Sequence, residues 1–257
     1  MDALNPRQFD IVRIARDEGQ VNVEDLAERF KVTPQTIRKD LNELCDRNVL
    51  QRYHGGALLS SGVENLGYES RQTLAEGEKL AIGKRAAELI PDNCSLIINI
   101  GTTTENVAAA LKGHKGLLVI TNNLNVANIL RPAEGVEVII TAGSLRKSDG
   151  GIVGSATYDF IKQFKVDYAV IGTSAIDVDG ALLDYDYREV RVSQAILENA
   201  RNIILVADNM KFERSAPVRI GHISQVDTFV TDVSPPADFS QICHDHNVQV
   251  VRLDSEE

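Results

Sequence analysis

The sequence predicts an α/β protein that has an N-terminal winged helix-turn-helix and, after it, a larger domain with a mostly parallel sheet. Two patterns predict this fold. Residues 1–59 hold three short helical patterns followed by a hairpin signal, whereas beyond residue 75 apolar, strand-like runs alternate with helical segments. Residues 60–74 contain Ser60-Ser61-Gly62 and no sustained period, so we expect a linker there and a separate domain over residues 75–257.

The composition is that of an ordinary globular protein, because 43% of the 257 residues are hydrophobic and 25% are charged. No apolar run approaches the roughly 18 residues that a membrane span needs, and the N-terminus carries charges where a signal peptide would be apolar. We therefore expect a cytoplasmic protein with no membrane partner. The sequence has three cysteines, Cys45, Cys94 and Cys243, and they form no CxxC pair. They indicate no metal site, no disulfide framework and no cofactor.

The net charge of −10 is unevenly divided between the two predicted domains. Residues 1–59 carry 9 Lys and Arg against 10 Asp and Glu, a net charge of −1. The remainder has 27 − 9 = 18 basic and 37 − 10 = 27 acidic residues, a net charge of −9. The acidic C-terminal domain is therefore not a nucleic-acid surface, and any DNA contact needs a local basic face in the N-terminal domain.

Three helix starts are visible in the N-terminal domain. Asn5-Pro6 is typical of an N-cap followed by the first helical position, and Gly19 ends that helix. Asn22 is expected to cap a second helix over residues 24–30. Thr33-Pro34 repeats the first signal and opens a third helix, which runs to about residue 48 and has Ile37, Leu41 and Leu44 on one apolar stripe.

Opposite this stripe, the third helix presents polar and basic side chains near its own N-terminus. The second helix of a helix-turn-helix lies in the major groove, so Arg38 is expected to pair with guanine and Gln35 with adenine. Thr36 suits a phosphate or a thymine methyl group. Residues 49–52 and 57–59 flank a glycine-rich hairpin turn, which completes a winged helix. The predicted contacts to double-stranded operator DNA are Thr33, Gln35, Thr36, Arg38, Lys39, Asn42, Arg52 and His54, of which Lys39 and Arg52 suit backbone phosphates.

The C-terminal domain is predicted as a largely parallel sheet with helices on both faces. Strands are expected at residues 96–100, 117–120, 136–140, 168–171, 203–207, 228–230 and 248–253. Helices are expected near residues 80–89, 104–111, 124–130, 158–164 and 189–200, with another starting near residue 237.

A binding site for a phosphorylated small molecule is expected at the carboxyl ends of these strands. Gly101-Thr102-Thr103-Thr104 follows a strand and opens a helix, where backbone N–H groups and the helix dipole favour an anion. Lys211 is suited to neutralise a phosphate, and Asp186 or Glu189 to accept hydroxyl groups. The loops past the other strand ends add Thr121, Asn122, Asn123, Asp149, Gly150 and Gly151.

Two segments resemble the signature of the DeoR family of bacterial sugar-metabolism repressors: Thr36-Ile37-Arg38-Lys39-Asp40-Leu41-Asn42-Glu43-Leu44 and Arg52-Tyr53-His54-Gly55-Gly56-Ala57. The resemblance extends to residues 100–103, 121–128, 149–154, 184–190 and 208–212. It implies a sensor fold shared with ribose-5-phosphate isomerase, and the middle three stretches are most similar to members that respond to glycerol 3-phosphate. Asn99 stands where the family usually has Asp, which leaves the role of that position in hydroxyl binding open.

Three functions are compatible with these patterns. The first is a repressor released by glycerol 3-phosphate, and the second is a repressor that responds to another sugar phosphate. The third is a sugar-phosphate isomerase that carries a winged helix, with Asp184, Asp186 or Glu189 as general base. Glycerol 3-phosphate has no carbonyl group to enolise, so we expect no enzyme. One recognition helix reads too few base pairs to select a site, so a dimer or tetramer is expected.

Overall fold

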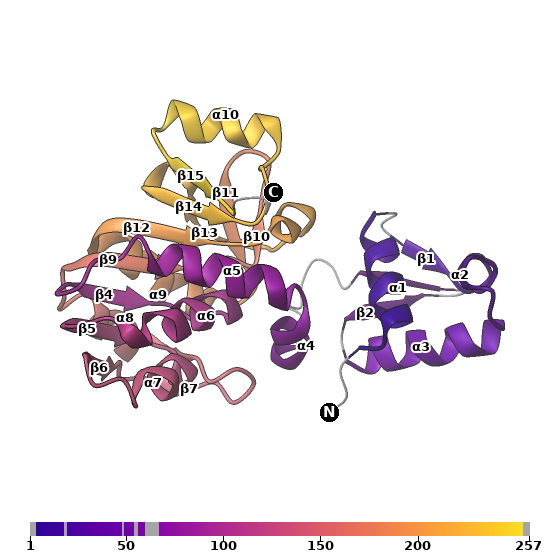
Figure 1. The fold of residues 1–257 in the computed structure, drawn as a ribbon, viewed down its shortest axis with the longest axis horizontal. Helices are drawn as coiled ribbons and strands as arrows, with labels where there is room; N and C mark the ends of the chain where they lie inside the picture. The colour runs from indigo at the N-terminus through magenta and orange to yellow at the C-terminus, as the bar shows by residue number, and fades with distance from the viewer. Residues whose placement is uncertain (1–3, 18–19, 48, 54–55, 60–66, 254–257) are drawn as a thin grey trace. The chain divides into compact units, whose positions relative to one another are not determined.

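The computed structural model describes residues 4–17, 20–47, 49–53, 56–59 and 67–253. The chain divides into two compact units, Met1–Leu74 and Ala75–Glu257 (Figure 1).

The N-terminal unit is a small helical domain with a three-stranded sheet. Its central helices begin where the capping signals predict, because the side chain of Asn22 accepts a hydrogen bond from Glu24 N at 2.8 Å and that of Thr33 accepts one from Thr36 N at 3.3 Å. The predicted stripe on the third helix is buried. In chain order the elements are α1 Pro6–Asp17, β1 Gln20–Asn22, α2 Val23–Phe30, α3 Pro34–Asp46, β2 Leu50–Tyr53, β3 Gly56–Leu59 and α4 Tyr68–Thr73.

The wing contains one strand that the sequence pattern does not reveal. β2 and β3 form the predicted hairpin, and β1 pairs antiparallel with the outer side of β3, with Gln20 opposite Leu58. β1 has only three residues and is held by a partner more than thirty positions away, so no local periodicity marks it.

A short helix, α4, lies within the predicted linker at residues 60–74. Within this short helix Gln72 Nε2 donates to Tyr68 Oη at 2.8 Å, and the Arg71 guanidinium lies 5.8 Å from the centre of the Tyr68 ring. These are contacts between neighbouring turns. A helix of six residues is too short to give a clear hydrophobic period, which is why the sequence did not show it.

The C-terminal unit is built on a seven-stranded sheet in which all neighbouring strands are parallel, as predicted. The strand order is β15-β14-β12-β9-β4-β5-β6. The strands are β4 Ser95–Ile98, β5 Leu117–Thr121, β6 Val136–Ile140, β9 Val166–Ile171, β12 Ala200–Val206, β14 Thr228–Thr231 and β15 Gln249–Arg252.

Helices cover both faces of this sheet, so its strands alternate between two cores. In β4, Leu96 and Ile98 pack against the helices α5, α6 and α7, whereas Ile97 faces α8, α9 and α10. The helices are α5 Glu76–Ala87, α6 Thr102–Ala110, α7 Leu124–Leu130, α8 Ser155–Ile161, α9 Tyr187–Glu198 and α10 Ala237–Asp245. α6 begins at Thr102 rather than at Thr104, so the threonines of the predicted phosphate loop form its first turn.

Short antiparallel strands at the rim escaped prediction because each has only two to five residues. Two form a hairpin and three form a small sheet of order β10-β11-β13. Their bounds are β7 Ser144–Leu145, β8 Ile152–Val153, β10 Ala175–Ile176, β11 Ala181–Asp184 and β13 Val218–His222, and three 3₁₀ turns lie at η1 Leu111–Gly113, η2 Asn209–Glu213 and η3 Ile223–Gln225. Across the described ranges, no helix has the length and apolar character needed to cross a bilayer.

Candidate functional sites

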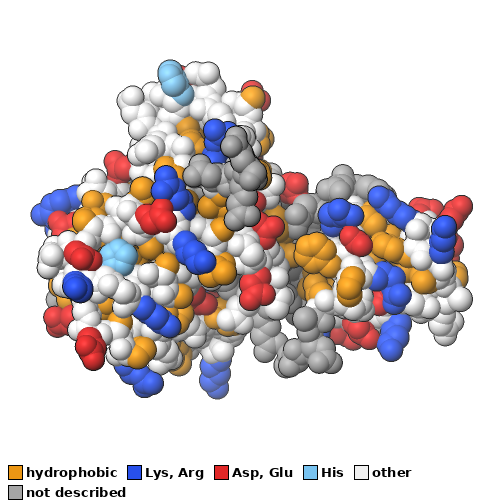
Figure 2. Space-filling view, viewed as in Figure 1, with side chains coloured by type: hydrophobic (Ala, Val, Ile, Leu, Met, Phe, Trp, Pro, Cys, Tyr) orange, Lys and Arg blue, Asp and Glu red, His pale blue; other side chains and the backbone are white. Residues whose placement is uncertain are grey.

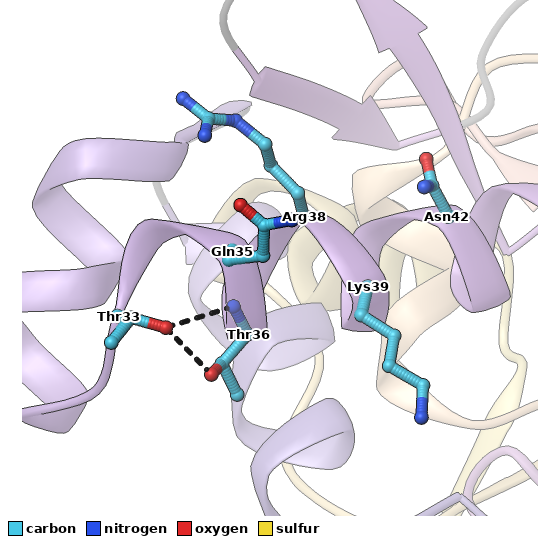
Figure 3. Close-up of a pocket in the computed structure, with 6 residues that line it drawn as sticks. All are labelled: Thr33, Gln35, Thr36, Arg38, Lys39 and Asn42. Atoms are coloured by element: carbon cyan, nitrogen blue, oxygen red, sulfur yellow. Dashed lines mark hydrogen bonds between the residues drawn. The ribbon is translucent and has the colours of Figure 1, made fainter.

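The start of α3 is fixed by its own side chains. Thr33 has extended backbone angles, φ −73° and ψ 150°, and Pro34 occupies the first turn. Besides accepting from the Thr36 amide, the Thr33 hydroxyl lies 2.9 Å from the Thr36 hydroxyl (Figure 3). The first turn of the helix is therefore held in one conformation, which positions the polar side chains that follow.

Six of the eight residues predicted to contact DNA come together on this helix. They line one concavity on the surface, and all lie on the side of α3 opposite its buried stripe (Figure 3): Thr33, Gln35, Thr36, Arg38, Lys39 and Asn42. Arg52 lies in β2 opposite Ala57, but its side chain is not described, and His54 falls outside the described residues.

The two cations of this surface are only weakly held. Arg38 Nη2 lies 3.4 Å from Glu24 Oε1, and Lys39 Nζ lies 4.0 Å from Glu43 Oε1. Both pairs are solvent-exposed, and such pairs contribute about 0.2–1 kcal/mol at most. In Figure 3 the two cations leave the helix in different directions. Either side chain can therefore exchange its carboxylate partner for a base edge or a phosphate at little cost.

A partly buried ion pair anchors α3 from its other side. Arg7 on α1 donates through Nε to Asp40 Oδ2 at 2.5 Å, and Asp40 is almost fully buried. Gln8 Nε2 donates to Glu43 Oε2 at 2.6 Å. Asp40 lies between residues predicted to contact DNA, but it faces α1 and holds the helix in place.

The face of the molecule shown in Figure 2 does not carry charge of one sign only. On the face shown in Figure 2, Lys and Arg side chains are interspersed with Asp and Glu on both units. This agrees with the nearly neutral charge of the N-terminal domain, and it favours a small basic contact surface over a broad basic patch.

In the C-terminal unit, the predicted phosphate loop forms the N-terminus of α6. Gly101 is the N-cap and accepts from Glu105 N at 3.0 Å. The Thr104 hydroxyl donates to the carbonyl oxygens of Asn99 and Gly101, both at 2.8 Å, so it braces the turn. The first N–H groups of any helix lack acceptors within the helix, which leaves the backbone of this turn suited to an anion.

The residues after β5 have mainly structural contacts. The Thr121 hydroxyl donates to Ile98 O at 2.7 Å and accepts from Asn123 N at 3.0 Å. Asn123 caps α7 through its Oδ1 and donates from Nδ2 to Glu105 Oε1 at 3.0 Å. Asn122 Nδ2 donates to Ile152 O, whereas its buried Oδ1 has no hydrogen-bond donor among the residues described.

Arg146, which the sequence analysis did not select, donates hydrogen bonds to the three acidic residues predicted for the effector site. Its Nε and Nη2 donate to the two carboxylate oxygens of Asp149 at 2.8 and 2.7 Å. Its Nη1 donates to Asp186 at 3.0 Å and its Nη2 to Glu189 at 2.5 Å. The two latter partners lie about forty positions away in the chain, so only the fold brings them to Arg146.

The pKa values of the carboxylates in this cluster are shifted in opposite directions. Burial, together with the nearby Asp184, raises the pKa of Glu189 to about 8 in spite of Arg146. Hydrogen bonds from Arg188 and Arg146 lower the pKa of Asp186 to about 2. Burial opposes the charge of Arg146, but Asp149 and Glu189 outweigh it and raise its pKa. Asp186 is therefore an ionised partner of the guanidinium at neutral pH.

The Asp149 loop packs on the turn that leads into α6. Gly150 has φ +73°, and its carbonyl oxygen accepts from Leu124 N at 2.9 Å. A Cβ atom at Gly151 would lie 2.6 Å from Ile100 Cδ1, so the end of the Ile100 side chain would have to shift for a larger residue there. This packing links the Arg146 cluster to the predicted phosphate loop.

The end of β4 and the end of β12 complete this edge of the sheet. Asn99 is buried, donates to Ser193 Oγ at 2.9 Å and accepts from Ile100 N at 2.7 Å, so it ties β4 to α9. Lys211 lies in η2, where its positive charge, with those of Lys79 and Arg214, acts on the buried Asp208. Lys79 and Asp208 were not among the predicted site residues.

Both units match models of known domain families. Residues 7–62 match the DeoR-like helix-turn-helix domain, and residues 75–233 match the DeoR C-terminal sensor domain. The chain belongs to the DeoR family. This DeoR-family chain is 47% identical over 244 residues to the glycerol-3-phosphate regulon repressor of Escherichia coli (strain K12). The matched region covers 95% of this chain and 97% of that protein.

Another similar protein is the glycerol-3-phosphate regulon repressor of Haemophilus influenzae (strain ATCC 51907 / DSM 11121 / KW20 / Rd), with 46% identity over 229 residues and 89% of each chain covered. Among solved structures, ribose 5-phosphate isomerase A from Neisseria gonorrhoeae has a TM-score of 0.39 and 13% identity over 52% of each chain. The likeness to the repressors of the DeoR family spans both units.

Proposed function

We propose that this protein is a transcriptional repressor of a carbon-utilisation operon, that it binds operator DNA through α3, and that glycerol 3-phosphate relieves the repression. The observation that carries the DNA-binding part is the single concavity lined by six polar and basic residues at the start of α3. The names of the similar proteins from E. coli and H. influenzae support the regulatory part and the effector.

In this proposal the recognition helix reads bases through the residues of its first turns. Arg38 offers the two-donor fork that suits guanine, Gln35 suits adenine, and Lys39 contacts phosphate. The weak pairing of Arg38 and Lys39 supports these roles. Selection of binding sites from random duplex DNA by the full chain tests this part: an enriched motif with repeated half-sites is expected, and failure to enrich any motif would contradict it.

The effector is proposed to bind where the strands of the C-terminal sheet end. Its phosphate meets the N-terminus of α6 at Gly101, Thr102 and Thr103, with Lys211 nearby. The effector's binding stabilises the fold, because a ligand at 100 times its Kd adds about 2.7 kcal/mol. A melting scan against a panel of polyol and sugar phosphates should give the largest rise in Tm with glycerol 3-phosphate. A larger rise with another sugar phosphate would keep the mechanism and change the effector.

An isomerase is the weaker alternative, and the Arg146 cluster argues against it. A general base must be able to take a proton from the substrate, but Asp186 and Glu189 both accept hydrogen bonds from Arg146. We infer that these carboxylates shape the site and do no acid–base chemistry. Incubation with ribose 5-phosphate, followed by an assay for the ketose, should give no conversion above the buffer rate.

The repressor is proposed to act as a dimer or tetramer. One α3 contacts too few base pairs to select a site in a genome, so two copies must bind two half-sites. Light scattering of the chain with and without selected DNA tests the proposal. A single copy bound to one isolated half-site would contradict it.

A further inference from the structure

Asp208 is a buried carboxylate whose hydrogen-bonding capacity is incompletely used. It follows the last strand residue of β12 by two positions and is only 2% exposed. Its Oδ1 has no hydrogen-bond donor among the residues that the structure describes. Burial opposes its ionisation, but the charges of Lys211, Lys79 and Arg214 outweigh burial and lower the pKa of Asp208. The result is a charged acceptor inside the unit, and such groups normally have a donor.

Asp208 does not make the helix-capping hydrogen bond that is usual for an Asp at this position. Asp208 occupies the N-cap position of η2, where its carboxylate would usually accept from the backbone of the next residues. It makes no such bond, and Asn209 N donates to Asp232 Oδ1 at 2.8 Å instead. The carboxylate of Asp208 is therefore not used as a helix cap.

Asp208 also differs from the acidic residues that the sequence analysis selected. Asp149, Asp186 and Glu189 each accept a hydrogen bond from Arg146. Their oxygens are partly committed to that guanidinium before any ligand arrives. An effector hydroxyl that seeks an acceptor would compete with Arg146 there, whereas at Asp208 Oδ1 it competes with no described donor.

Packing brings the end of β12 close to the first turn of α6. Gly172, directly after β9, lies between them: a Cβ atom there would be 3.7 Å from Thr104 Cγ2, 3.9 Å from Ile100 O and 3.9 Å from Val206 O. Lys79 belongs to α5, which packs against α6 closely enough for a Cβ atom at Gly83 to clash with Asn106. Asp208 thus follows a strand whose end lies beside the proposed phosphate site.

We propose that Asp208 accepts a hydrogen bond from a hydroxyl group of the phosphorylated effector and makes the sensor selective for polyol phosphates over alkyl phosphates. The inference rests on the proposed function, since it assumes that the phosphate lies at the N-terminus of α6. Lys211, Lys79 and Arg214 screen the phosphate from the negative charge of Asp208. A carboxylate only accepts hydrogen bonds, so it attracts a hydroxyl and repels a second anionic group.

The test compares two ligands on two proteins by calorimetric titration of the full chain. Glycerol 3-phosphate carries hydroxyls, and propyl phosphate has the same three-carbon frame without them. Wild type should bind glycerol 3-phosphate about ten-fold or more tighter than propyl phosphate, as expected for a hydrogen bond to a charged acceptor. Asp208→Asn should lose most of this preference. It should bind propyl phosphate within about two-fold of wild type, because the substitution removes only the contact with the ligand hydroxyl.

Asp167→Asn is the matched control. Asp167 lies near the start of β9, at the end of the parallel strands opposite to the proposed site, and accepts a hydrogen bond from Ser95 N. It should lower Tm without changing the ligand preference. If Asp208→Asn melts too early to titrate, Asp208→Glu repeats the test with the charge kept and the carboxylate displaced, and the preference should again fall.

Three results would overturn the inference, and they are distinguishable. A folded Asp208→Asn variant that keeps the full preference for glycerol 3-phosphate would show that another group reads the hydroxyl, while the proposed function would stand. Wild type that binds neither ligand would overturn the proposed effector itself, and the role of Asp208 with it. Equal weakening of both ligands in Asp208→Asn would assign Asp208 a purely structural role.

Discussion

The Arg38 guanidinium lies 3.4 Å from the Glu24 carboxylate, so the side chain proposed to read a guanine is paired with an acidic residue of the preceding helix. Arg38 is 52% exposed and Glu24 62%, which makes the pair weak and easily replaced. In the proposed complex DNA competes with Glu24 for Arg38, so we expect Glu24 to lower the affinity for every site.

Removal of this competitor should strengthen operator binding. Glu24→Gln is expected to raise the affinity for a selected operator by about 1.5- to 5-fold, which corresponds to the worth of an exposed ion pair. Fluorescence anisotropy at fixed salt measures it. Glu28→Gln is the control, because it removes the same charge from the same helix. An equal gain in both variants would mean that only the overall charge matters.

Arg38→Ala and Lys39→Ala should differ in kind. Loss of Arg38 removes the two-donor contact to a base edge, so Arg38→Ala should abolish the preference for the operator over random DNA. Lys39→Ala should weaken binding to all sequences evenly and reduce the salt dependence. Competition titrations against random duplexes separate the two effects. The proposed roles fail if both variants lose specificity to the same extent.

Glu189 should make stability depend on pH in an unusual direction. Its pKa is raised from 4.5 to about 8, so between these values the folded protein holds a proton that the unfolded chain has released. The contribution of Glu189 to stability therefore falls as the pH rises through this range. Glu189→Gln cannot titrate, and its free energy of unfolding relative to wild type should rise from about pH 5 to about pH 8. Urea denaturation measures it, and a pH-independent difference would mean that Glu189 is ionised throughout.

Acidic residues in the proposed phosphate loop should prevent induction. Replacing Thr102 and Thr103 by Glu places negative charge at the N-terminus of α6 and should repel a phosphate there. The N-terminal unit folds around its own core, so operator affinity without ligand should stay near wild type. Ser at the same two positions keeps the hydroxyls and serves as the control. Circular dichroism confirms folding, and a folded Glu variant still released by glycerol 3-phosphate would place the phosphate elsewhere.

The sequence sufficed for features that depend on neighbouring residues. Caps at Asn22 and Thr33, the buried stripe on α3 and the alternation of strands and helices are all local patterns, and the structure contains each of them. The polar face of α3 was equally visible, because helical spacing determines which residues share a side.

Features formed between distant segments of the chain could not be predicted from the sequence. β1 is a strand only because β3 lies beside it, and Arg146 matters only because the fold brings Asp186 and Glu189 to it. The sequence analysis proposed Asp186 or Glu189 as a hydroxyl acceptor, but it could not show that the two carboxylates share one guanidinium. Nor could it distinguish Asp208 from other acidic residues, since its burial and its missing donor are properties of the packed structure.

The most direct test of the account is a titration of the complex between the full chain and its selected operator with glycerol 3-phosphate. We expect release of the DNA, with operator affinity reduced about 10- to 100-fold at saturation, which corresponds to about 1.4–2.7 kcal/mol of coupling between the two units. Operator affinity that stays unchanged at glycerol 3-phosphate concentrations that saturate the protein in calorimetry would contradict it.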